Sequence, residues 1–206
     1  MEFSNQKISE FLKDLSSSSP APGGGAVAGF ISALSASLNS MVYSLTIGKK
    51  KYEQLSDDEK EKINRFKKES DKFIEESLSF MQEDKENFMF LMNSYSMPKN
   101  TEDEKEKRSI AIEENTVKAM EVPYRLCKRS FEFYNNLEIM KKYGNKMLFS
   151  DLQISAVLLH AAIESSIINV KVNLDFLKDK NKYLHIYKEL DDILEKSEKL
   201  KKEIVS

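Results

Sequence analysis

Residues 19–52 read SPAPGGGAVAGFISALSASLNSMVYSLTIGKKKY. The first seven of these positions hold two prolines, which cannot lie inside a helix, and three glycines, which reach backbone conformations closed to other residues. We therefore expect a tight loop up to Gly25. A helix is predicted over residues 26–47, because this stretch lacks proline, is rich in alanine and leucine, and precedes Gly48 and a run of lysines. Small side chains recur along this helix and would let a second backbone approach closely, so we expect it at the centre of the fold.

Composition limits the function classes. The chain has 206 residues and a mass of 23.8 kDa, which fits one domain over residues 1–206. Its 32 Lys and Arg residues balance 34 Asp and Glu residues, a formal net charge of -2, and give no sign of nucleic-acid binding. The single cysteine, Cys127, excludes an internal disulfide, and the 2 histidines are too few for a histidine-rich metal site. No signal-peptide pattern and no apolar run of membrane-spanning length is evident, so we expect a cytoplasmic protein with no membrane partner.

The rest of the chain is predicted to be helices separated by turn signals. Ser56 and Thr101 each precede a glutamate by three residues, the capping-box pattern that opens a helix. Pro123 falls inside one helical pattern and predicts a kink or a break near Val122. The expected helices cover residues 4–15, 26–47, 57–94, 102–140 with that interruption, 151–177 and 179–203. With no strand pattern or internal repeat, the sequence predicts an all-α, single-domain bundle of six or seven helices.

An acidic residue, Asp84, interrupts the apolar stripe of residues 57–94. It comes three residues after Met81 and four before Phe88. The other members of the stripe are Ile63, Phe66, Phe73, Ile74, Ser77 and Leu91. A carboxylate on a buried face must be paired, hydrogen-bonded or protonated, and burial raises its pKa toward values useful for proton transfer. Asp84 is therefore a candidate catalytic group; the alternatives are an interhelical salt bridge, or a helix turned so that Asp84 reaches water.

Further polar groups could bind a ligand. The amides of Gly23, Gly24 and Gly25 could hold an anion or a polar carbonyl, or these glycines could only allow a sharp turn. Five polar residues around the helix at 151–177 could converge on one pocket: Asn145, Ser150, Asp151, Asn169 and Asn173. Helix capping by the Ser-Asp pair and an interhelical hydrogen-bond layer for the asparagines are the simpler alternative. The lysines Lys49, Lys50 and Lys51 could grip an anionic tail or form a solvated helix end.

Taken together, these stretches resemble the formiminotetrahydrofolate cyclodeaminase and methenyltetrahydrofolate cyclohydrolase family. The resemblance runs from about residue 8 to about residue 179 and rests on an ordered set of motifs. These are SPAPGGGAVA at 19–28, GKKKY at 48–52, EDKENF at 83–88, MPK at 97–99, VP at 122–123, GN at 144–145, SD at 150–151 and NVKVNL at 169–174. Lys85 and Asn87 depart from the family, which usually has alanines at these positions.

The resemblance implies an all-α fold, self-association through helices, and a tetrahydrofolate substrate that carries a one-carbon unit. It also implies that Asp84 is the proton acceptor, because the family assigns that role to the acid at this position. The other assignments are hypotheses: the site is lined by Ser19 and the amides of residues 23–25, the pterin is bound by Asn145, Ser150 and Asp151, and the glutamate tail is attracted by Lys49–Lys51.

The reaction that the resemblance implies is the cyclodeaminase step. N10 of the folate attacks the formimino carbon on N5, and ammonia leaves as 5,10-methenyltetrahydrofolate forms. One acid-base group beside that carbon could serve both proton transfers, and no cofactor beyond the folate is required. Two alternatives remain: a methenyltetrahydrofolate cyclohydrolase that forms 10-formyltetrahydrofolate, and a non-catalytic helical module that binds folate or a partner protein. We expect a homodimer, because the small-residue helix favours close helix pairing, and a folate with or without a polyglutamate tail.

Overall fold

A computed structural model describes residues 2–206, and helices account for almost all of it. Its elements are η1 (Phe3–Asn5), α1 (Ile8–Leu15), α2 (Gly24–Ser44), α3 (Lys50–Glu53), α4 (Asp57–Tyr95), α5 (Glu102–Glu132), α6 (Tyr134–Tyr143), η2 (Lys146–Leu148), α7 (Phe149–Phe176), η3 (Lys180–Tyr183) and α8 (Leu184–Val205), where η marks 3-10 helices. No strand occurs in residues 2–206. Because α3 is a single turn, the prediction of an all-α bundle of six or seven helices is confirmed.

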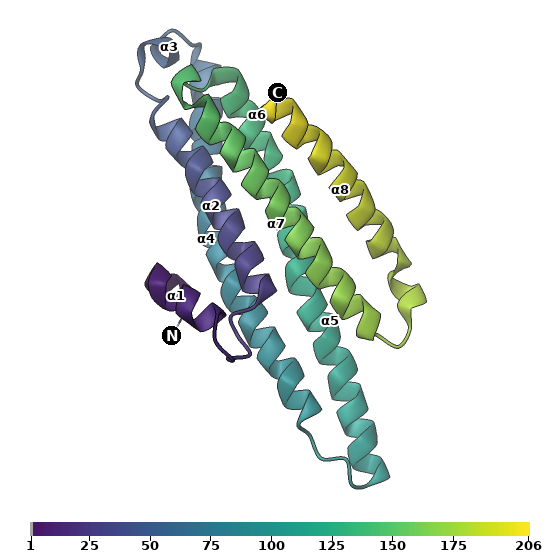
Figure 1. The fold of residues 1–206 in the computed structure, drawn as a ribbon. Coiled ribbons are helices and arrows are strands. Elements are labelled where there is room, and N and C mark those ends of the chain that lie inside the picture. The colour runs from purple at the N-terminus through teal and green to yellow at the C-terminus, as the bar shows by residue number, and fades with distance from the viewer. Residues whose placement is uncertain (1) are drawn as a thin grey trace.

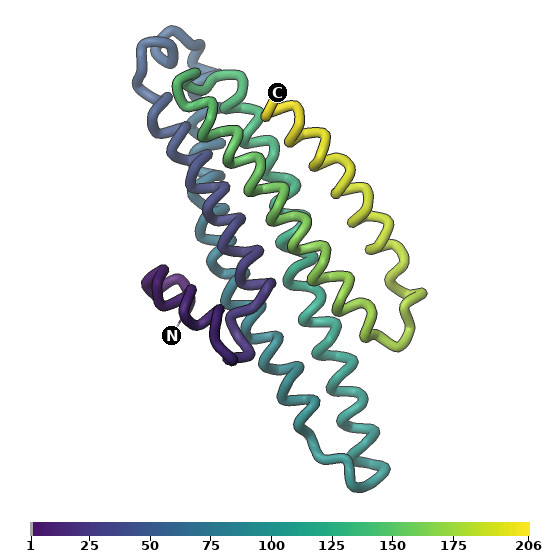
Figure 2. The backbone as a smooth tube through the Cα atoms, in the orientation of Figure 1, coloured from purple at the N-terminus to yellow at the C-terminus, as the bar shows by residue number. Residues whose placement is uncertain are grey.

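Four long helices form a ring in one elongated bundle (Figure 1). α2 packs against α4, α4 against α5, α5 against α7, and α7 against α2. α8 lies outside this ring against α7, and α1 lies beside the lower half of α2 (Figure 1). The backbone trace shows that the lower ends of α4 and α5 extend beyond α2 and α7 as a hairpin (Figure 2).

Small residues let α2 approach its neighbours closely, as its sequence predicts. A Cβ atom on Gly29 would lie 2.7 Å from Cγ of Met81 and 2.9 Å from the backbone oxygen of Ser77, so the surfaces of α2 and α4 are in direct contact. On the other side, the hydroxyls of Ser35 and Ser155 each donate to the other residue's backbone carbonyl at 2.8 Å. These paired bonds fix α2 against α7.

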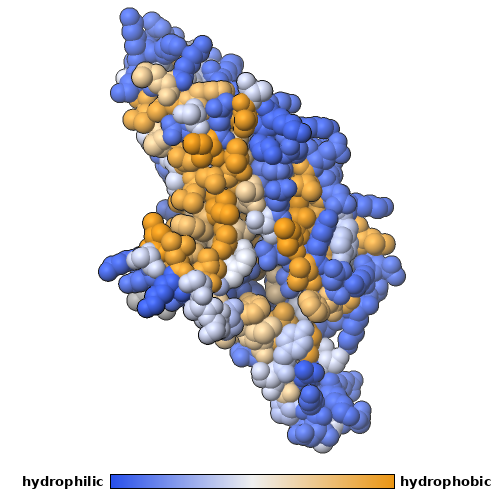
Figure 3. All heavy atoms as spheres, viewed as in Figure 1, coloured by the Kyte–Doolittle hydropathy of each residue, from blue (hydrophilic) through white to orange (hydrophobic). Residues whose placement is uncertain are grey.

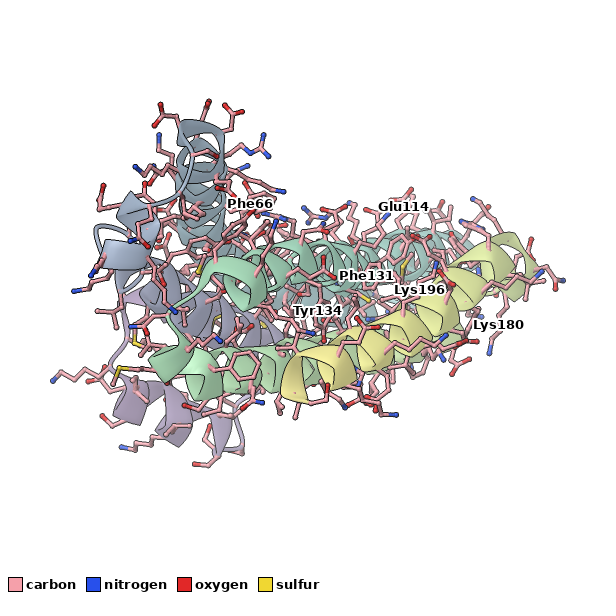
Figure 4. The ribbon with its side chains drawn as sticks, turned by 90° about the horizontal axis from the view of Figure 1, so that it is seen from above. Phe66, Glu114, Phe131, Tyr134, Lys180 and Lys196 are labelled. Carbon is pink, nitrogen blue, oxygen red and sulfur yellow. The ribbon has the colours of Figure 1, made fainter. Side chains whose placement is uncertain are left out.

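The last two helical segments close the outer side of the bundle. In the view from above, the side chain of Tyr134 lies between α6 and α7 (Figure 4), and its hydroxyl donates to the backbone oxygen of Ala156 at 3.4 Å. α8 buries apolar residues such as Leu190 and carries surface ion pairs such as Lys199 with Glu195 at 2.7 Å. α8 is thus the solvent-facing outer helix that its sequence predicts.

The N-terminal ends of α2 and α7 differ from the prediction. α2 begins at Gly24, with Gly23 as its N-cap residue, so two of the three loop glycines form the first helical turn. α7 begins at Phe149, which places Ser150 and Asp151 inside its first turn. The suggestion that these two residues cap the helix is therefore wrong.

α5 passes through its proline without a break. The sequence predicts a kink or a break near Val122, but the helix continues past Pro123 to Glu132, so no break occurs there. The interruption lies instead at Phe133, between α5 and α6. The capping boxes are confirmed, since the amides of Glu59 and Glu104 donate to the hydroxyls of Ser56 and Thr101 at 3.3 and 3.2 Å.

Two helices are long and apolar enough to cross a membrane by length and composition alone, α2 and the segment Lys146–Phe176. The expectation that no apolar run reaches this length was too strict. In the bundle, 61% and 50% of their apolar windows are buried, as in the core helices of a folded domain. The apolar side chains that remain exposed lie on the outer side of the α2 and α7 pair.

We call this outer surface the α2/α7 face. Its exposed apolar members are Leu34 and Met41 of α2, Leu45 directly after α2, and Ile154, Val157, Ile168, Val172 and Phe176 of α7. The space-filling view shows hydrophobic surface along both helices, with α1 projecting beside the lower part and a recess above it (Figure 3). A contiguous apolar surface of this kind is typical of a protein contact.

Candidate active site

A cavity of about 190 Å³ lies where the start of α2 meets α4, α5 and α7. The residues that line this cavity come from distant parts of the chain and lie together only in the folded protein. They consist of Phe3, the loop residues 20–23, the first turn of α2, Asp84, Lys85 and Phe88 of α4, Ala119 of α5, and Asn169, Val172 and Asn173 of α7. The glycine segment, the acid and the two asparagines predicted as site residues therefore share one cavity.

Asp84 rests against the first turn of α2. A Cβ atom on Gly25 would lie 2.0 Å from Oδ1 of Asp84, so only glycine leaves room for the carboxyl. Burial raises the pKa of Asp84 to about 6, against the opposing effect of the Ala26 N–H, which faces the carboxyl and lowers the pKa. No cation within the described chain contributes to this shift, which sets aside the salt-bridge alternative. Near neutral pH the group is mostly ionised yet takes a proton readily, as reversible proton transfer requires.

The two asparagines are held by their amide nitrogens. Nδ2 of Asn169 donates to the Ser165 carbonyl at 2.8 Å, and Nδ2 of Asn173 donates to the Asn169 carbonyl at 2.9 Å and to the Ala119 carbonyl at 3.3 Å. Oδ1 of Asn169 would lie 3.4 Å from a Cβ atom on Gly24, next to the start of α2. The amide oxygens thus remain as hydrogen-bond acceptors for a ligand.

Pro123 explains why the Ala119 carbonyl can bind Asn173. In a regular helix the amide of residue 123 donates to the carbonyl of residue 119, but proline has no N–H. The freed carbonyl of Ala119 accepts the Asn173 side chain, which belongs to a different helix. The residue that the sequence marks as a helix breaker therefore helps to position a side chain of the cavity.

Several lining residues were not among the predicted site residues, and three of them have large side chains: Phe3, Lys85 and Phe88. Lys85 and Phe88 follow Asp84 by one and four positions on the same helix, so helical spacing could have found Phe88 at least. Nζ of Lys85 lies 4.7 Å from the centroid of the Phe3 ring, and that ring packs edge-on against Phe11 of α1 at 5.6 Å. No local sequence signal places Phe3, because the packing of α1 brings it to the cavity.

Ser19 does not take its expected place. Its hydroxyl donates to the carbonyl of Ala21 at 2.8 Å and shapes the loop from within. Ser19 is exposed and does not line the cavity. The prediction that Ser19 lines the site is therefore wrong.

Asn145 lies at the far end of α2. Its N–H donates to Oγ1 of Thr46 at 3.0 Å, just beyond the end of α2, whereas Asn169 meets Gly24 at the start. The 21 residues of α2 separate these ends by roughly 30 Å, at about 1.5 Å per residue. Asn145 and Lys146 line a second cavity, of about 340 Å³, at this far end.

The other predicted binding residues also lie at the far end. Ser150 and Asp151 are in the first turn of α7, which follows the second cavity, and Lys49–Lys51 are exposed in and just before α3. The sequence predicted that Asn145, Ser150 and Asp151 could share one pocket with Asn169 and Asn173. Within a single chain this prediction is wrong.

The remaining reactive side chains are structural. His160 is buried, with Nδ1 bonded to Oγ of Ser197 at 2.9 Å and Nε2 lying 3.0 Å from Glu198. Cys127 is fully buried, and burial raises the pKa of its thiol to about 12. In residues 2–206, no group of three His, Cys, Asp or Glu side chains gathers where it could hold a metal ion.

The Asp84 cavity suits proton transfer on part of a larger ligand. It offers one carboxyl, the amides of a helix start, two amide oxygens and apolar walls. Pockets that enclose a drug-sized ligand measure roughly 300–1,000 Å³. At about 190 Å³, this cavity holds only the reacting portion of such a molecule.

Comparisons with known proteins agree with one another. Residues 7–205 match the family described as Formiminotransferase-cyclodeaminase. A methenyltetrahydrofolate cyclohydrolase from Methylorubrum extorquens is 36% identical over 92% of this chain and 89% of its own length. The formimidoyltransferase-cyclodeaminases of Gallus gallus and Rattus norvegicus are 30% identical over 84% and 82% of this chain, which spans only 31% and 30% of their lengths. The crystal structure of formiminotetrahydrofolate cyclodeaminase from Thermotoga maritima has a TM-score of 0.78 and 25% identity, over 98% of this chain and 93% of that one.

Proposed function

Because this chain belongs to the formiminotransferase-cyclodeaminase family, we propose that it is a one-carbon folate enzyme that converts 5-formiminotetrahydrofolate to 5,10-methenyltetrahydrofolate and ammonia. The observation that carries the proposal is Asp84, a partly buried carboxyl with a pKa of about 6 at the wall of a cavity. A general base works best when its pKa lies near the working pH.

Asp84 moves one proton in the proposed reaction. N10 attacks the carbon of the protonated formimino group on N5, so the C–N10 bond forms and the C=N bond to the outer nitrogen becomes single. The Asp84 carboxylate takes the proton from N10 and returns it to the outer nitrogen. That nitrogen then leaves as ammonia, and the positive charge stays on the N5–C–N10 unit of the product.

The other walls of the cavity orient the folate. The oxygens of Asn169 and Asn173 accept hydrogen bonds from the N–H groups of the pterin, since their amide nitrogens are already held by backbone carbonyls. Phe3 and Phe88 contribute apolar surface for the aromatic part of the ligand. This chemistry uses no cofactor other than the folate substrate.

A second candidate reaction is favoured by the Methylorubrum extorquens relative, which matches this chain over most of its length and is named a methenyltetrahydrofolate cyclohydrolase. In that reaction water adds to the methenyl carbon and Asp84 takes one proton from it. Asp84 then gives this proton to N5 as the C–N5 bond breaks, and the added hydroxyl loses its remaining proton to solvent as it becomes the formyl C=O of 10-formyltetrahydrofolate. The same carboxyl serves both reactions.

Absorbance at the methenyltetrahydrofolate band separates the candidates. Growth of the band with ammonia release from 5-formiminotetrahydrofolate supports the cyclodeaminase, and decay of 5,10-methenyltetrahydrofolate faster than in buffer supports the cyclohydrolase. If neither compound reacts but reduced folates raise the melting temperature, the chain is a folate-binding module. Without such a rise, it is a module for a partner protein.

Replacing the proposed base tests its role. We expect Asp84→Asn to lower kcat by about 10²- to 10⁴-fold, the usual contribution of a general base. Wild-type kcat/KM should fall below a pH of about 6, where Asp84 becomes protonated. The matched control is Glu86→Gln, an exposed acid two positions on whose Oε1 accepts from Gln82, and it should keep wild-type turnover. Full activity of Asp84→Asn removes this residue from the mechanism.

We also propose that the protein is a cytoplasmic homodimer. Its lone cysteine is a buried free thiol, which is compatible with a reducing compartment. The exposed apolar residues of the α2/α7 face supply a surface that a second copy would cover.

A further inference from the structure

Lys85 places a positive charge at the wall of the Asp84 cavity. Among the described residues that line this cavity, it alone is a cation. It follows Asp84 on α4 and is half-buried. Within residues 2–206 Lys85 forms no ion pair, and the neighbouring Glu83 pairs with Arg125 instead. The charge of Lys85 therefore acts on whatever ligand occupies the cavity.

The ring of Phe3 holds this ammonium in place. Nζ of Lys85 lies 4.7 Å from the centroid of the ring, within the range of a cation–π contact. Phe3 is buried and packs edge-on against Phe11 of α1 at 5.6 Å, and the Phe11 ring lies 5.5 Å from that of Phe30 of α2. This row of three rings fixes Phe3, which itself lines the cavity, and with it the charge of Lys85.

The negative charge of Asp84 does not cancel that of Lys85. Burial and the N–H of Ala26 shift the pKa of Asp84, and Lys85 makes no contribution to this shift. The start of α2 already compensates the ionised carboxyl, because the N–H groups there favour negative charge. A ligand between the two side chains therefore meets a cation at one wall and a compensated carboxylate at another.

We propose that Lys85 is a specificity-determining residue whose ammonium disfavours cationic one-carbon folates in the cavity and favours neutral ones. The inference rests on the proposed folate reactions, in which the cavity holds the N5–C–N10 unit. It extends them by assigning a residue to discrimination between charge states of the folate. The cationic states are the protonated 5-formimino and the 5,10-methenyl compounds, and the neutral state is the 10-formyl compound.

Both candidate reactions convert a cation into a neutral adduct. The protonated formimino group and the methenyl unit each carry one positive charge. When N10 or water adds to the carbon and Asp84 takes the released proton, the folate becomes neutral and the carboxyl becomes protonated. In a cavity of about 190 Å³, Lys85 is close enough to repel the cation, and this repulsion vanishes in the adduct. Lys85 thus raises the free energy of the bound cation relative to the adduct.

The two reactions end in different charge states. The cyclodeaminase product is again a cation, whereas the cyclohydrolase product is neutral. Repulsion by Lys85 therefore promotes release of the methenyl compound in the first reaction and its hydration in the second. In both cases the charge shortens the time for which the methenyl compound stays bound.

The binding of one cationic and one neutral folate tests this role. The probes are 5,10-methenyltetrahydrofolate and 5-formyltetrahydrofolate, a neutral folate of similar size, and Asp84→Asn is the background, since it limits turnover. Isothermal titration calorimetry gives the two dissociation constants and their ratio, methenyl over formyl. We expect Lys85→Met to lower this ratio about tenfold, because two like charges a few ångströms apart no longer repel. Lys85→Arg keeps the charge and should keep the ratio.

Lys68→Met is the matched control. Lys68 is exposed on the same helix, and 17 residues at about 1.5 Å place it roughly 26 Å from Lys85. The substitution makes the same change of charge outside the cavity and should leave the ratio unaltered. An unaltered ratio in Lys85→Met, or an equal fall in Lys68→Met, overturns the inference.

Initial rates with wild-type Asp84 give a second readout. Lys85→Met should lower both KM and kcat for the cationic substrate, because the bound cation is no longer destabilised relative to the adduct. A structural defect would lower kcat without lowering KM. A higher KM in Lys85→Met would show that the ammonium attracts the folate, which overturns the inference.

The measurements separate this inference from the proposed reactions. If the wild-type protein turns over either folate and the ratio does not change in Lys85→Met, the reaction stands and the role of Lys85 fails. If the protein binds both folates without turnover and the ratio falls, the discrimination stands and the proposed reactions fail. If it binds neither folate, both fail.

Discussion

At the scale of single residues, the site depends on how Asp84 is held. Its carboxyl occupies the space left by the missing side chain of Gly25, at the start of α2, while the bundle removes much of its contact with water. The helix start favours the ionised form and burial opposes it. The balance of these two effects leaves Asp84 with a pKa of about 6, and ionisation of the buried carboxyl lowers the free energy of unfolding.

That cost predicts a pH-dependent stability difference. Because the pKa of Asp84 is raised to about 6 in the folded state, the folded protein binds this proton more tightly than the unfolded chain does. The contribution to stability is complete below pH about 4 and is lost as the pH rises through 6. Asp84→Asn should therefore raise the free energy of unfolding by about 1–2 kcal/mol at pH 8, a discount from the full shift for partial exposure.

Thermal unfolding of both proteins at pH 4 and pH 8 measures this difference. We expect the melting temperature of Asp84→Asn to exceed that of wild type by about 2–6 °C at pH 8 and to match it at pH 4. An equal or lower melting temperature at pH 8 would show that ionised Asp84 is not strained by burial.

The contact with Gly25 predicts a second effect. Gly25→Ala should displace the Asp84 carboxyl, because the new Cβ atom would sit 2.0 Å from Oδ1, and overpacking of this kind costs about 1–3 kcal/mol. Gly23→Ala is the matched control for folding, since nothing lies within 4 Å of its Cβ position. We expect a lower melting temperature and a loss of turnover for Gly25→Ala, and an unchanged melting temperature for Gly23→Ala. Equal melting temperatures for the two variants would contradict this packing.

At the scale of elements, α5 exchanges a regular hydrogen bond for a contact with α7. Pro123 removes the amide that would occupy the Ala119 carbonyl, and Asn173 uses that carbonyl instead. Proline inside a helix is less favourable than alanine by about 3 kcal/mol, so Pro123 destabilises α5 locally. The benefit is a fixed asparagine in the cavity wall.

Replacing the proline separates these two effects. Pro123→Ala should raise the melting temperature, because the helix regains its hydrogen bond, and raise the KM for folate several-fold, because the new N–H competes with Asn173 for the Ala119 carbonyl. Pro98→Ala, in the exposed turn between α4 and α5, should leave KM unchanged. An unchanged KM for Pro123→Ala, measured by initial rates, would show that Asn173 is positioned without this bond.

The sequence predicts the helices, and the face of a helix on which a residue lies, better than it predicts at which end of the bundle that residue lies. Helical spacing is enough to put Asp84 on a buried face and to pair Asn169 with Asn173, because each of these inferences concerns one helix. The prediction that Asn145 groups with Asn169 and Asn173 fails because α7 separates them: Asn145 lies just before its start and the two asparagines lie near its end. Phe3 escapes prediction for a related reason, since only tertiary packing of α1 brings it to the cavity.

At the scale of the whole molecule, the bundle is a ring of four helices with one side left apolar. α2 and α7 are apolar enough to resemble membrane spans because they face the core on one side and the α2/α7 face on the other. Such a surface is expected to be covered in the assembled protein.

A charge placed on this face should separate the copies. Val157→Glu should give a folded monomer, since burying an unpaired carboxylate in an interface costs several kcal/mol. We expect an unchanged helical circular dichroism spectrum, a halved mass by light scattering and at least about tenfold less activity. Leu184→Glu, an equally exposed apolar position on α8, is the control and should remain a dimer. An active dimer of Val157→Glu would place the contact elsewhere.

The position of Phe3 has a practical consequence for anyone who expresses this protein. An affinity tag or fusion partner joined before Met1 begins two residues from a wall of the cavity, and it also adjoins η1 and α1. The other terminus, Ser206, ends α8 on the outer side of the bundle (Figure 1). Purification handles therefore belong at the carboxyl end, and an inactive preparation tagged at the amino end says little about the enzyme itself.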